Sequence, residues 1–214
     1  MKIIEPAVEI LTPLNGQEIL KHIELCARNC YKSENKITED SAERMVKFLL
    51  NKKHDSLLEH YQITCRLTCS IACYKDLTRH RHASWAIEST RWCGYEKGKF
   101  GSEIKFIKPV NIPEDSLAFS YWEDCMRTCE RYYMGMAAIS GITPDETSLL
   151  LPQATAASVI MTANLRELRH IFSLRCDKAA RPEIRFIMTL LLNKLTIAIP
   201  CVFDDLFERF NVED

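Results

Sequence analysis

The sequence of 214 residues is poor in glycine, with six in all and none of them clustered. Rossmann folds and P-loop proteins hold phosphate with glycine-rich turns, so an anionic ligand must here be bound by side chains. Neither sign of charge is in excess, with 28 basic and 29 acidic residues, which argues against general coating of nucleic acid. No apolar run reaches the length of a membrane span, which excludes such a span.

The N-terminal stretch also lacks the charged-then-apolar layout of a signal peptide. Ten cysteines are present, but they form no C-x-x-C pair, and H-E-x-x-H is absent. Zinc sites usually contain such tighter pairs, so we expect no metal. Disulfides are not expected without a secretory signal. We therefore expect a cytoplasmic protein in which most thiols are small core residues.

Hydrophobic periodicity predicts one α+β domain over residues 1–214, with a modest, mostly antiparallel sheet flanked by helices. The clearest strand is 61–70, where apolar and polar residues alternate. Thr38 is expected to be the N-cap of the second helix. The expected helices are about 16–31, 38–53, 71–78, 115–139, 164–174 and 182–199, with a short one after Thr143, and the expected strands are 61–70, 103–107 and 154–162.

The densest cluster of reactive side chains is RHRHASWAIESTR, from Arg79 to Arg91. Arginine presents a fixed fork of donors that suits phosphate and carboxylate. So many cations repel one another unless anions neutralise them, which predicts a polyanionic ligand of nucleotide size. A solvated basic surface is the plainer alternative. However, Trp85, Ile87 and Trp92 interleave with the charges, which is unusual for a purely solvated face.

Three further segments concentrate reactive side chains. In HDSLLEH, His54 and Ser56 either contact a ligand from the turn before the strand or have no such role, and the sequence favours neither. In NLRELRH, Arg166, Arg169 and His170 share one helical face, although arginines that pair with glutamates are the ordinary explanation. The last segment runs from Arg175 to the helix start at Pro182, and anions favour helix N-termini. No nucleophile with its base is evident by spacing.

The order of these segments resembles that of the flavin-dependent thymidylate synthases, the thymidylate synthase complementing protein family. Arg79-His80-Arg81 followed by Ser89 is similar to the family signature RHR-x7-S. Upstream, CARNCY is similar to A-R-x-S-Y and HDSLLEH to H-x-S-x-x-E-H. Downstream, the resemblance continues in LLLPQAT, NLRELRHIFSLR and PEIR. The matches span about residues 27 to 190, and several ordered motifs are far more specific than one.

The resemblance implies a homotetramer that binds FAD at subunit interfaces and converts dUMP to dTMP with NADPH and methylenetetrahydrofolate. In this family the reduced flavin delivers hydride, arginines stabilise charge on the pyrimidine, and no enzyme nucleophile adds to it. Carried over by position, the roles are as follows. The catalytic residues are Arg79 and Arg175; the FAD contacts are His54, Ser56, Arg79, His80, Arg81, Asn164 and His170; the substrate contacts are Glu88, Ser89, Arg91 and Arg175.

The nucleotide pocket departs from the family pattern. The family's usual residues are replaced by Asp76, by Ala86-Ile87, by Ser148 or Leu149, and by Ala179. An alternative is therefore a divergent flavoprotein of the same fold that acts on another pyrimidine nucleotide or has lost synthase activity. A third hypothesis is a non-catalytic binder of single-stranded nucleic acid through the arginines, Trp85 and Trp92. The balanced charge weighs against this third hypothesis, so we do not expect nucleic acid as a partner. We do not expect a membrane either, because the sequence has no apolar run of sufficient length.

Overall fold

The computed structural model describes residues 1–96, 98 and 101–210. The chain forms two compact units. Unit 1 comprises Met1–Ala7, Leu67–Arg79 and Ala86–Ile160, and unit 2 comprises Val8–Arg66, His80–Trp85 and the chain from Met161 onward. The expectation of a single domain over residues 1–214 stays a prediction.

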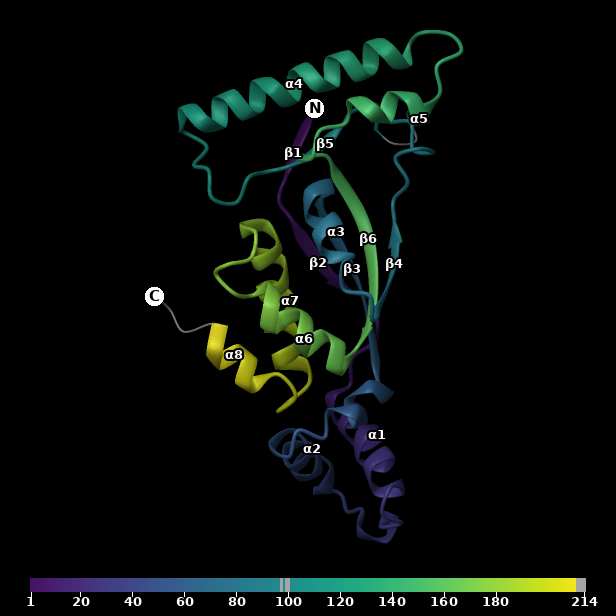
Figure 1. The fold of residues 1–214 in the computed structure, drawn as a ribbon, viewed down its shortest axis with the longest axis vertical. Helices are drawn as coiled ribbons and strands as arrows, with labels where there is room; N and C mark the ends of the chain where they lie inside the picture. The colour runs from purple at the N-terminus through teal and green to yellow at the C-terminus, as the bar shows by residue number, and fades with distance from the viewer. Residues whose placement is uncertain (97, 99–100, 211–214) are drawn as a thin grey trace. The chain divides into compact units, whose positions relative to one another are not determined.

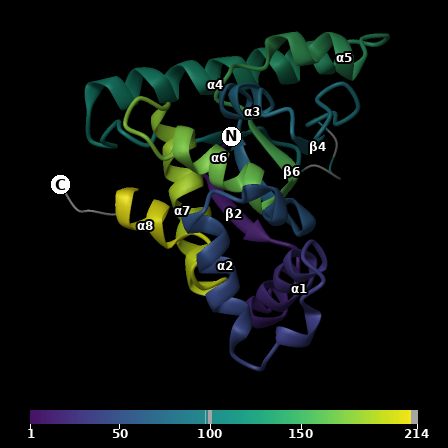
Figure 2. The same cartoon turned by 60° about the horizontal axis from the view of Figure 1, so that its bottom comes forward.

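Unit 1 contains a parallel strand pair and three helices. β1 (Lys2–Ile4) pairs with β5 (Lys105–Ile107), with Ile3 opposite Phe106. α3 (Ile71–Leu77) follows a long strand, and α4 (Leu117–Ala137) contacts α5 (Pro144–Thr147) and η4 (Ser148–Leu150); α4 is the longest helix drawn in Figure 2. The core of this unit is a cluster of buried side chains from Tyr95, Ile104, Phe106, Met126 and Tyr133.

Unit 2 is mainly helical. α1 (Gly16–Asn29) packs on α2 (Ser41–Asn51), and α6 (Leu165–Arg175) contacts both α7 (Pro182–Ala198) and α8 (Asp204–Phe210), as Figure 1 shows. Two 3-10 helices, η1 (Glu34–Lys36) and η2 (Asp55–His60), connect these elements. Apolar residues recur on the inner faces of the helices and are buried there, which is the physical reason that periodicity located most of them.

A four-stranded sheet has the order β2 (Ala7–Ile10), β3 (Gln62–Ser70), β6 (Ala156–Asn164) and β4 (Ala83–Ile87). β3 and β6 are antiparallel, because the Leu165 N–H donates to the Tyr61 carbonyl while the Thr64 and Thr162 hydroxyls lie 2.9 Å apart. The expected alternation in β3 is confirmed, since Ile63, Cys65, Leu67 and Cys69 are fully buried. The predicted α+β class with a mostly antiparallel sheet is therefore confirmed.

The structure corrects three details. The second helix begins at Ser41 rather than after Thr38, because the Ser41 hydroxyl accepts from the Thr38 N–H (2.8 Å) and donates to the buried Glu24 (2.8 Å). The mixed segment 83–87 forms β4, for which no strand was predicted. None of the ten cysteines is in a disulfide, but only half of them are buried, so the core holds fewer than expected. Among the described residues, no helix is long and apolar enough to cross a membrane.

Candidate functional site

His80, the central residue of the RHR motif, is buried in unit 2 with an exposed fraction of 5%. Its Nε2 accepts a hydrogen bond from Nε of Arg175 at 2.9 Å, and its Nδ1 lies 3.5 Å from a carboxylate oxygen of Glu167. The ring of His170 stands edge-on at 5.8 Å. Two motifs that are distant in sequence thus contribute side chains to one cluster around an imidazole.

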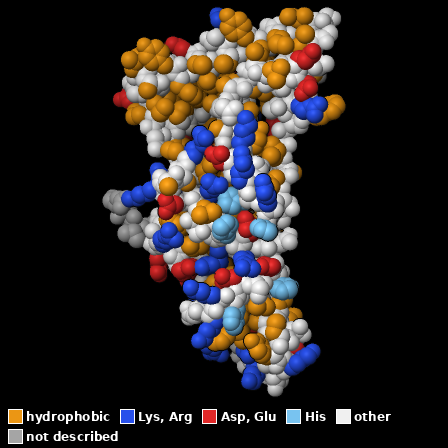
Figure 3. Space-filling view, in the orientation of Figure 1, with side chains coloured by type: hydrophobic (Ala, Val, Ile, Leu, Met, Phe, Trp, Pro, Cys, Tyr) orange, Lys and Arg blue, Asp and Glu red, His pale blue; other side chains and the backbone are white. Residues whose placement is uncertain are grey.

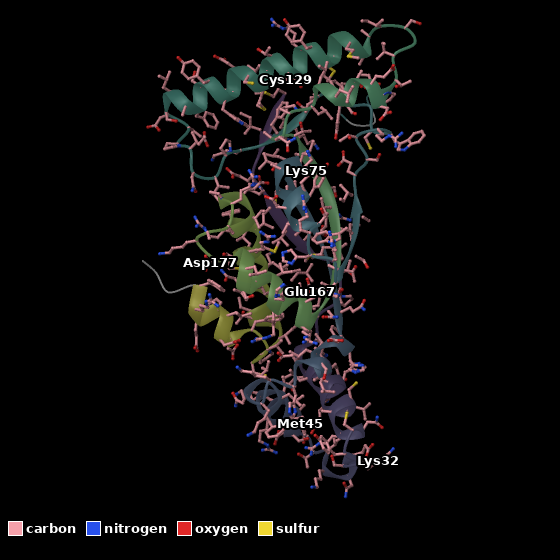
Figure 4. The ribbon with its side chains drawn as sticks, viewed as in Figure 1. Lys32, Met45, Lys75, Cys129, Glu167 and Asp177 are labelled. Atoms are coloured by element: carbon pink, nitrogen blue, oxygen red, sulfur yellow. The ribbon has the colours of Figure 1, made fainter. Side chains whose placement is uncertain are left out.

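Helix α6 supplies all of these partners of His80. Its N-cap is Asn164, whose side chain accepts from the Glu167 N–H at 2.8 Å and so fixes the first turn. Glu167 and His170 then fall three residues apart, on one face of the helix. Glu167, labelled on α6 in Figure 4, is itself buried at 7% exposure. Arg175 ends the same helix.

His80 is held in its neutral form. Burial, then the positive charge of Arg175, then the neighbouring His170 lower the pKa of His80 from 6.5 to about 4. Because Nε2 accepts from Arg175, the ring proton belongs on Nδ1, where it faces Glu167. The imidazole therefore links a cation to an anion without carrying charge itself.

A hollow of about 480 Å³ opens beside this cluster in unit 2. It is lined by two residues that the sequence predicted as cofactor contacts, Asn164 and His170, and by four that it did not assign this role, Glu59, His82, Arg166 and Glu167. Arg166 donates to Glu59 at 2.5 Å, so the ordinary pairing of arginine with glutamate holds here.

A second hollow of unit 2, of about 670 Å³, contains the other two predicted cofactor residues outside the RHR motif, His54 and Ser56. The His54 ring stands edge-on to Phe48 at 6.4 Å. Arg166 lines both hollows. Tyr31, Lys36 and Lys53 also line the larger hollow.

The two outer arginines of the RHR motif are exposed. Arg79 belongs to unit 1, where its backbone N–H donates to the Asp76 carbonyl (3.3 Å) just after α3. Arg81 belongs to unit 2 and lies just before β4. The central histidine is thus buried and its two flanking arginines face solvent, and the predicted FAD contact at His80 stays a prediction.

The predicted substrate residues Glu88, Ser89 and Arg91 lie in unit 1, in the segment that follows β4. The Glu88 carboxylate accepts from the Tyr95 hydroxyl and from the Ser158 N–H, both at 3.1 Å. Glu88, Tyr95 and Ser158 border a cavity of about 730 Å³. These hydrogen bonds tie the segment to the sheet.

Arg91 donates through Nε to Asp145 at 2.8 Å, and both side chains are exposed. Asp145 is the second residue of α5, and its backbone carbonyl accepts from the Ser148 hydroxyl at 2.6 Å. A carboxylate thus neutralises one predicted phosphate ligand, and sequence reasoning did not single it out. Within residues 1–96, 98 and 101–210, no three histidine, cysteine or acidic side chains gather as they would around a metal ion.

A family model described as thymidylate synthase complementing protein matches residues 15–201. The chain belongs to this family. It is 32% identical to the flavin-dependent thymidylate synthase of Pyrococcus abyssi over 164 residues, which are 76% of this chain and 66% of that protein. The corresponding enzyme of Geobacter sulfurreducens is 27% identical over 190 residues, covering 86% of this chain and 80% of the relative. The chain thus spans just under two thirds of the first relative.

Two solved structures have a similar fold. PolB from Streptomyces cacaoi, a UMP/dUMP methylase bound with 5-Br dUMP, superposes with a TM-score of 0.74 at 20% identity, covering 98% of both chains. Thymidylate synthase X from Helicobacter pylori, with FAD and dUMP, gives a TM-score of 0.75 at 18% identity and covers 95% of this chain and 99% of that one. The family that the motifs indicated is therefore confirmed, together with its fold.

Proposed function

We propose that this protein is a methyltransferase that converts dUMP to dTMP with FAD, methylenetetrahydrofolate and NADPH. The observation that carries the proposal is the cluster around His80, which joins the RHR motif to Glu167, His170 and Arg175 of another family motif. The match to the family model over residues 15–201 supports it, as do relatives named flavin-dependent thymidylate synthase.

The residues of unit 2 fit FAD. Tyr31, Phe48 and His54 give the larger hollow flat, partly apolar walls for a ring system, and Lys36 and Lys53 bring positive charge for a diphosphate. The smaller hollow adds hydrogen-bonding groups at Asn164 and His170, beside the buried His80. We assign FAD binding to these groups together with Ser56, Arg79 and Arg81. The reduced cofactor, when bound, supplies hydride to the pyrimidine.

The chain's own residues bind and orient the nucleotide. Arg79 and Arg175 stabilise negative charge that develops on the pyrimidine, which arginine does without giving up a proton. His80 fixes the Arg175 guanidinium by accepting from its Nε, and a neutral imidazole does so without repelling it. Ser89 and Arg91 hold the phosphate. No nucleophile of the enzyme takes part in this scheme.

A second candidate is a methylase that accepts UMP or another pyrimidine nucleotide. The observation in its favour is the altered pocket of unit 1, where Asp145 pairs with Arg91 and Ser148 or Leu149 stands where the family pattern has an arginine. A carboxylate this close weakens the attraction of Arg91 for phosphate, so the binding energy must come from other contacts. The fold neighbour PolB is described as a UMP/dUMP methylase, which makes UMP the first competitor to test.

We also propose a cytoplasmic homotetramer. Hydrophobic side chains gather over α4 in Figure 3, and Leu117, Tyr132 and Leu149 of unit 1 are 70%, 61% and 83% exposed. Exposed apolar patches are typical of interaction surfaces, and a reducing cytoplasm suits ten cysteines that form no disulfide. Light scattering on the purified protein tests the assembly; a monomer at micromolar concentration would contradict it.

The first experiment is a visible spectrum of the protein with FAD, followed by anaerobic titration with dUMP and, separately, UMP. A flavin band that shifts with dUMP supports the proposal, and complete turnover with all cosubstrates establishes it. A band that shifts only with UMP favours the second candidate. Absence of any flavin band after FAD addition contradicts both. Arg175→Gln should abolish turnover, whereas Arg127→Gln, on the exposed surface of α4, should not.

A further inference from the structure

The segment from Glu88 to Tyr95 is fixed at both ends within unit 1. At its start, the Glu88 N–H donates to the Ser158 carbonyl at 2.9 Å and the Ser158 N–H donates back to the Glu88 carboxylate at 3.1 Å. At its end, the Tyr95 N–H donates to the hydroxyl of Tyr133 at 3.2 Å. Tyr95 and Tyr133 are buried, with 6% and 0% of their surfaces exposed, so this end is anchored in the core.

The two ends are also joined to each other. The Tyr95 hydroxyl donates to the second oxygen of the Glu88 carboxylate at 3.1 Å. Between these residues, the Ser89 carbonyl accepts from the N–H groups of Trp92 and Cys93 at 3.2 and 3.0 Å, which folds the loop into a turn. Hydrogen bonds to an ionised acceptor are stronger than neutral ones. One carboxylate therefore closes the base of the loop that carries Ser89 and Arg91.

We propose that Glu88 is a positioning residue, whose bridge between Ser158 and Tyr95 holds the loop in the shape that presents Ser89 and Arg91 to the phosphate of the nucleotide. A loop ordered before binding does not have to be ordered by the ligand, which raises affinity without a new contact. The sequence predicts Glu88 as a substrate contact, and its two intramolecular hydrogen bonds support an indirect role in binding the same nucleotide. The identity of the ligand rests on the proposed function, but the bridge does not.

The bridge is tested without ligand by limited trypsin digestion of the full chain. Arg91 is exposed and lies inside the loop, so cleavage after it reports how often the loop opens. Tyr95→Phe removes only the bridging hydroxyl and should accelerate this cleavage about tenfold. Tyr121→Phe, at an exposed tyrosine of the same unit, is the matched control. Cleavage after the exposed Arg127 is the internal reference.

Two digestion results overturn the bridge. An unchanged rate after Arg91 in both Tyr95→Phe and Glu88→Ala would mean that the carboxylate does not hold the loop. Equal acceleration after Arg91 and Arg127 would mean that the substitutions destabilise the whole unit and that Glu88 is merely structural. Selective acceleration after Arg91, larger in Glu88→Ala than in Glu88→Gln, supports the bridge, because glutamine keeps one oxygen acceptor.

The positioning role is tested in the FAD-loaded protein by titration of the flavin band. Tyr95→Phe and Glu88→Gln should raise the dissociation constant of dUMP, and the KM, about tenfold. The kcat, the affinity for FAD and the binding of deoxyuridine, which has no phosphate, should stay unchanged. Weaker deoxyuridine binding in Glu88→Gln would show a direct contact with base or sugar and overturn the indirect role. If dUMP does not shift the flavin band of the wild-type protein, the proposed function is refuted. The digestion experiment still tests the bridge in that case, because it uses no ligand.

Discussion

Acidification should unfold this protein partly through one histidine, His80. Its pKa lies near 4 in the folded chain, because burial and the neighbouring Arg175 and His170 disfavour the imidazolium, whereas an exposed histidine titrates near 6.5. The folded state therefore does not take up the proton that the unfolded state binds as the pH falls below 6.5. The destabilisation caused by His80 is absent above pH 6.5 and grows as the pH falls from 6.5 to 4. Below both pKa values it stays constant.

The size of this loss follows from the two pKa values. Each unit of difference corresponds to about 1.4 kcal/mol, so His80 should lower the free energy of unfolding by about 1.4 kcal/mol at pH ~5.5 and by about 3 kcal/mol at pH ~4. A domain is typically stable by only about 5–15 kcal/mol. One buried imidazole thus accounts for a sizeable part of the acid sensitivity.

The assay is urea unfolding of the wild type and of His80→Gln near pH 7, 5.5 and 4. Glutamine offers a donor and an acceptor but does not titrate, so the wild-type value should fall relative to the variant by the amounts above. Taking the difference removes the shared contribution of carboxylates such as Asp205, whose pKa burial raises but the hydrogen bond and charge of Arg169 lower further, so that the net shift is downward. His60→Gln, at an exposed histidine, is the control. Parallel pH profiles for wild type and His80→Gln would refute the reasoning.

Three further predictions concern stability and reactivity. Thr143→Ala removes the capping box of α5 and should cost about 1 kcal/mol in urea unfolding, and an unchanged midpoint would contradict it. The exposed Cys30 should react with a disulfide reagent at least about 100-fold faster than the buried Cys65, because burial raises the Cys65 pKa to about 12; equal rates would exclude this. Arg169→Lys loses the two-pronged contact with Asp205 and should speed hydrogen exchange in α8, while Arg209→Lys should not.

Much of the fold could be predicted because single faces are buried. Alternation located β3, and the cap pairs at Thr143 and Asn164 located the starts of α5 and α6. Periodicity fails where burial is not regular. None of the five residues of β4 (ASWAI) is buried, so the segment has no alternation of buried and exposed positions, and its strand character comes from pairing with β6. α8 is too short for a periodic signal and depends on α6 and α7.

The candidate site, like the fold, could be predicted from the sequence only in part. The motifs single out a set of arginines and histidines whose roles stay predictions, and they did not predict the acidic partners, because pairing across the fold has no local signal. Glu59 and Arg166 are 107 residues apart in the chain, and Arg91 and Asp145 are 54 apart. The placement of the predicted residues in two hollows and a clamped loop likewise depends on tertiary packing.

These acidic partners change what the cationic cluster means. The cations of RHRHASWAIESTR would repel one another without anions nearby. From the sequence alone, we expect a ligand to neutralise their charge. In the folded chain, part of the positive charge is already removed without a ligand: Asp145 pairs with Arg91, and His80 is held neutral. A nucleotide phosphate that binds Arg91 must therefore compete with Asp145. Affinity then depends on how well the loop is ordered beforehand, and that order rests on Glu88 rather than on the number of arginines.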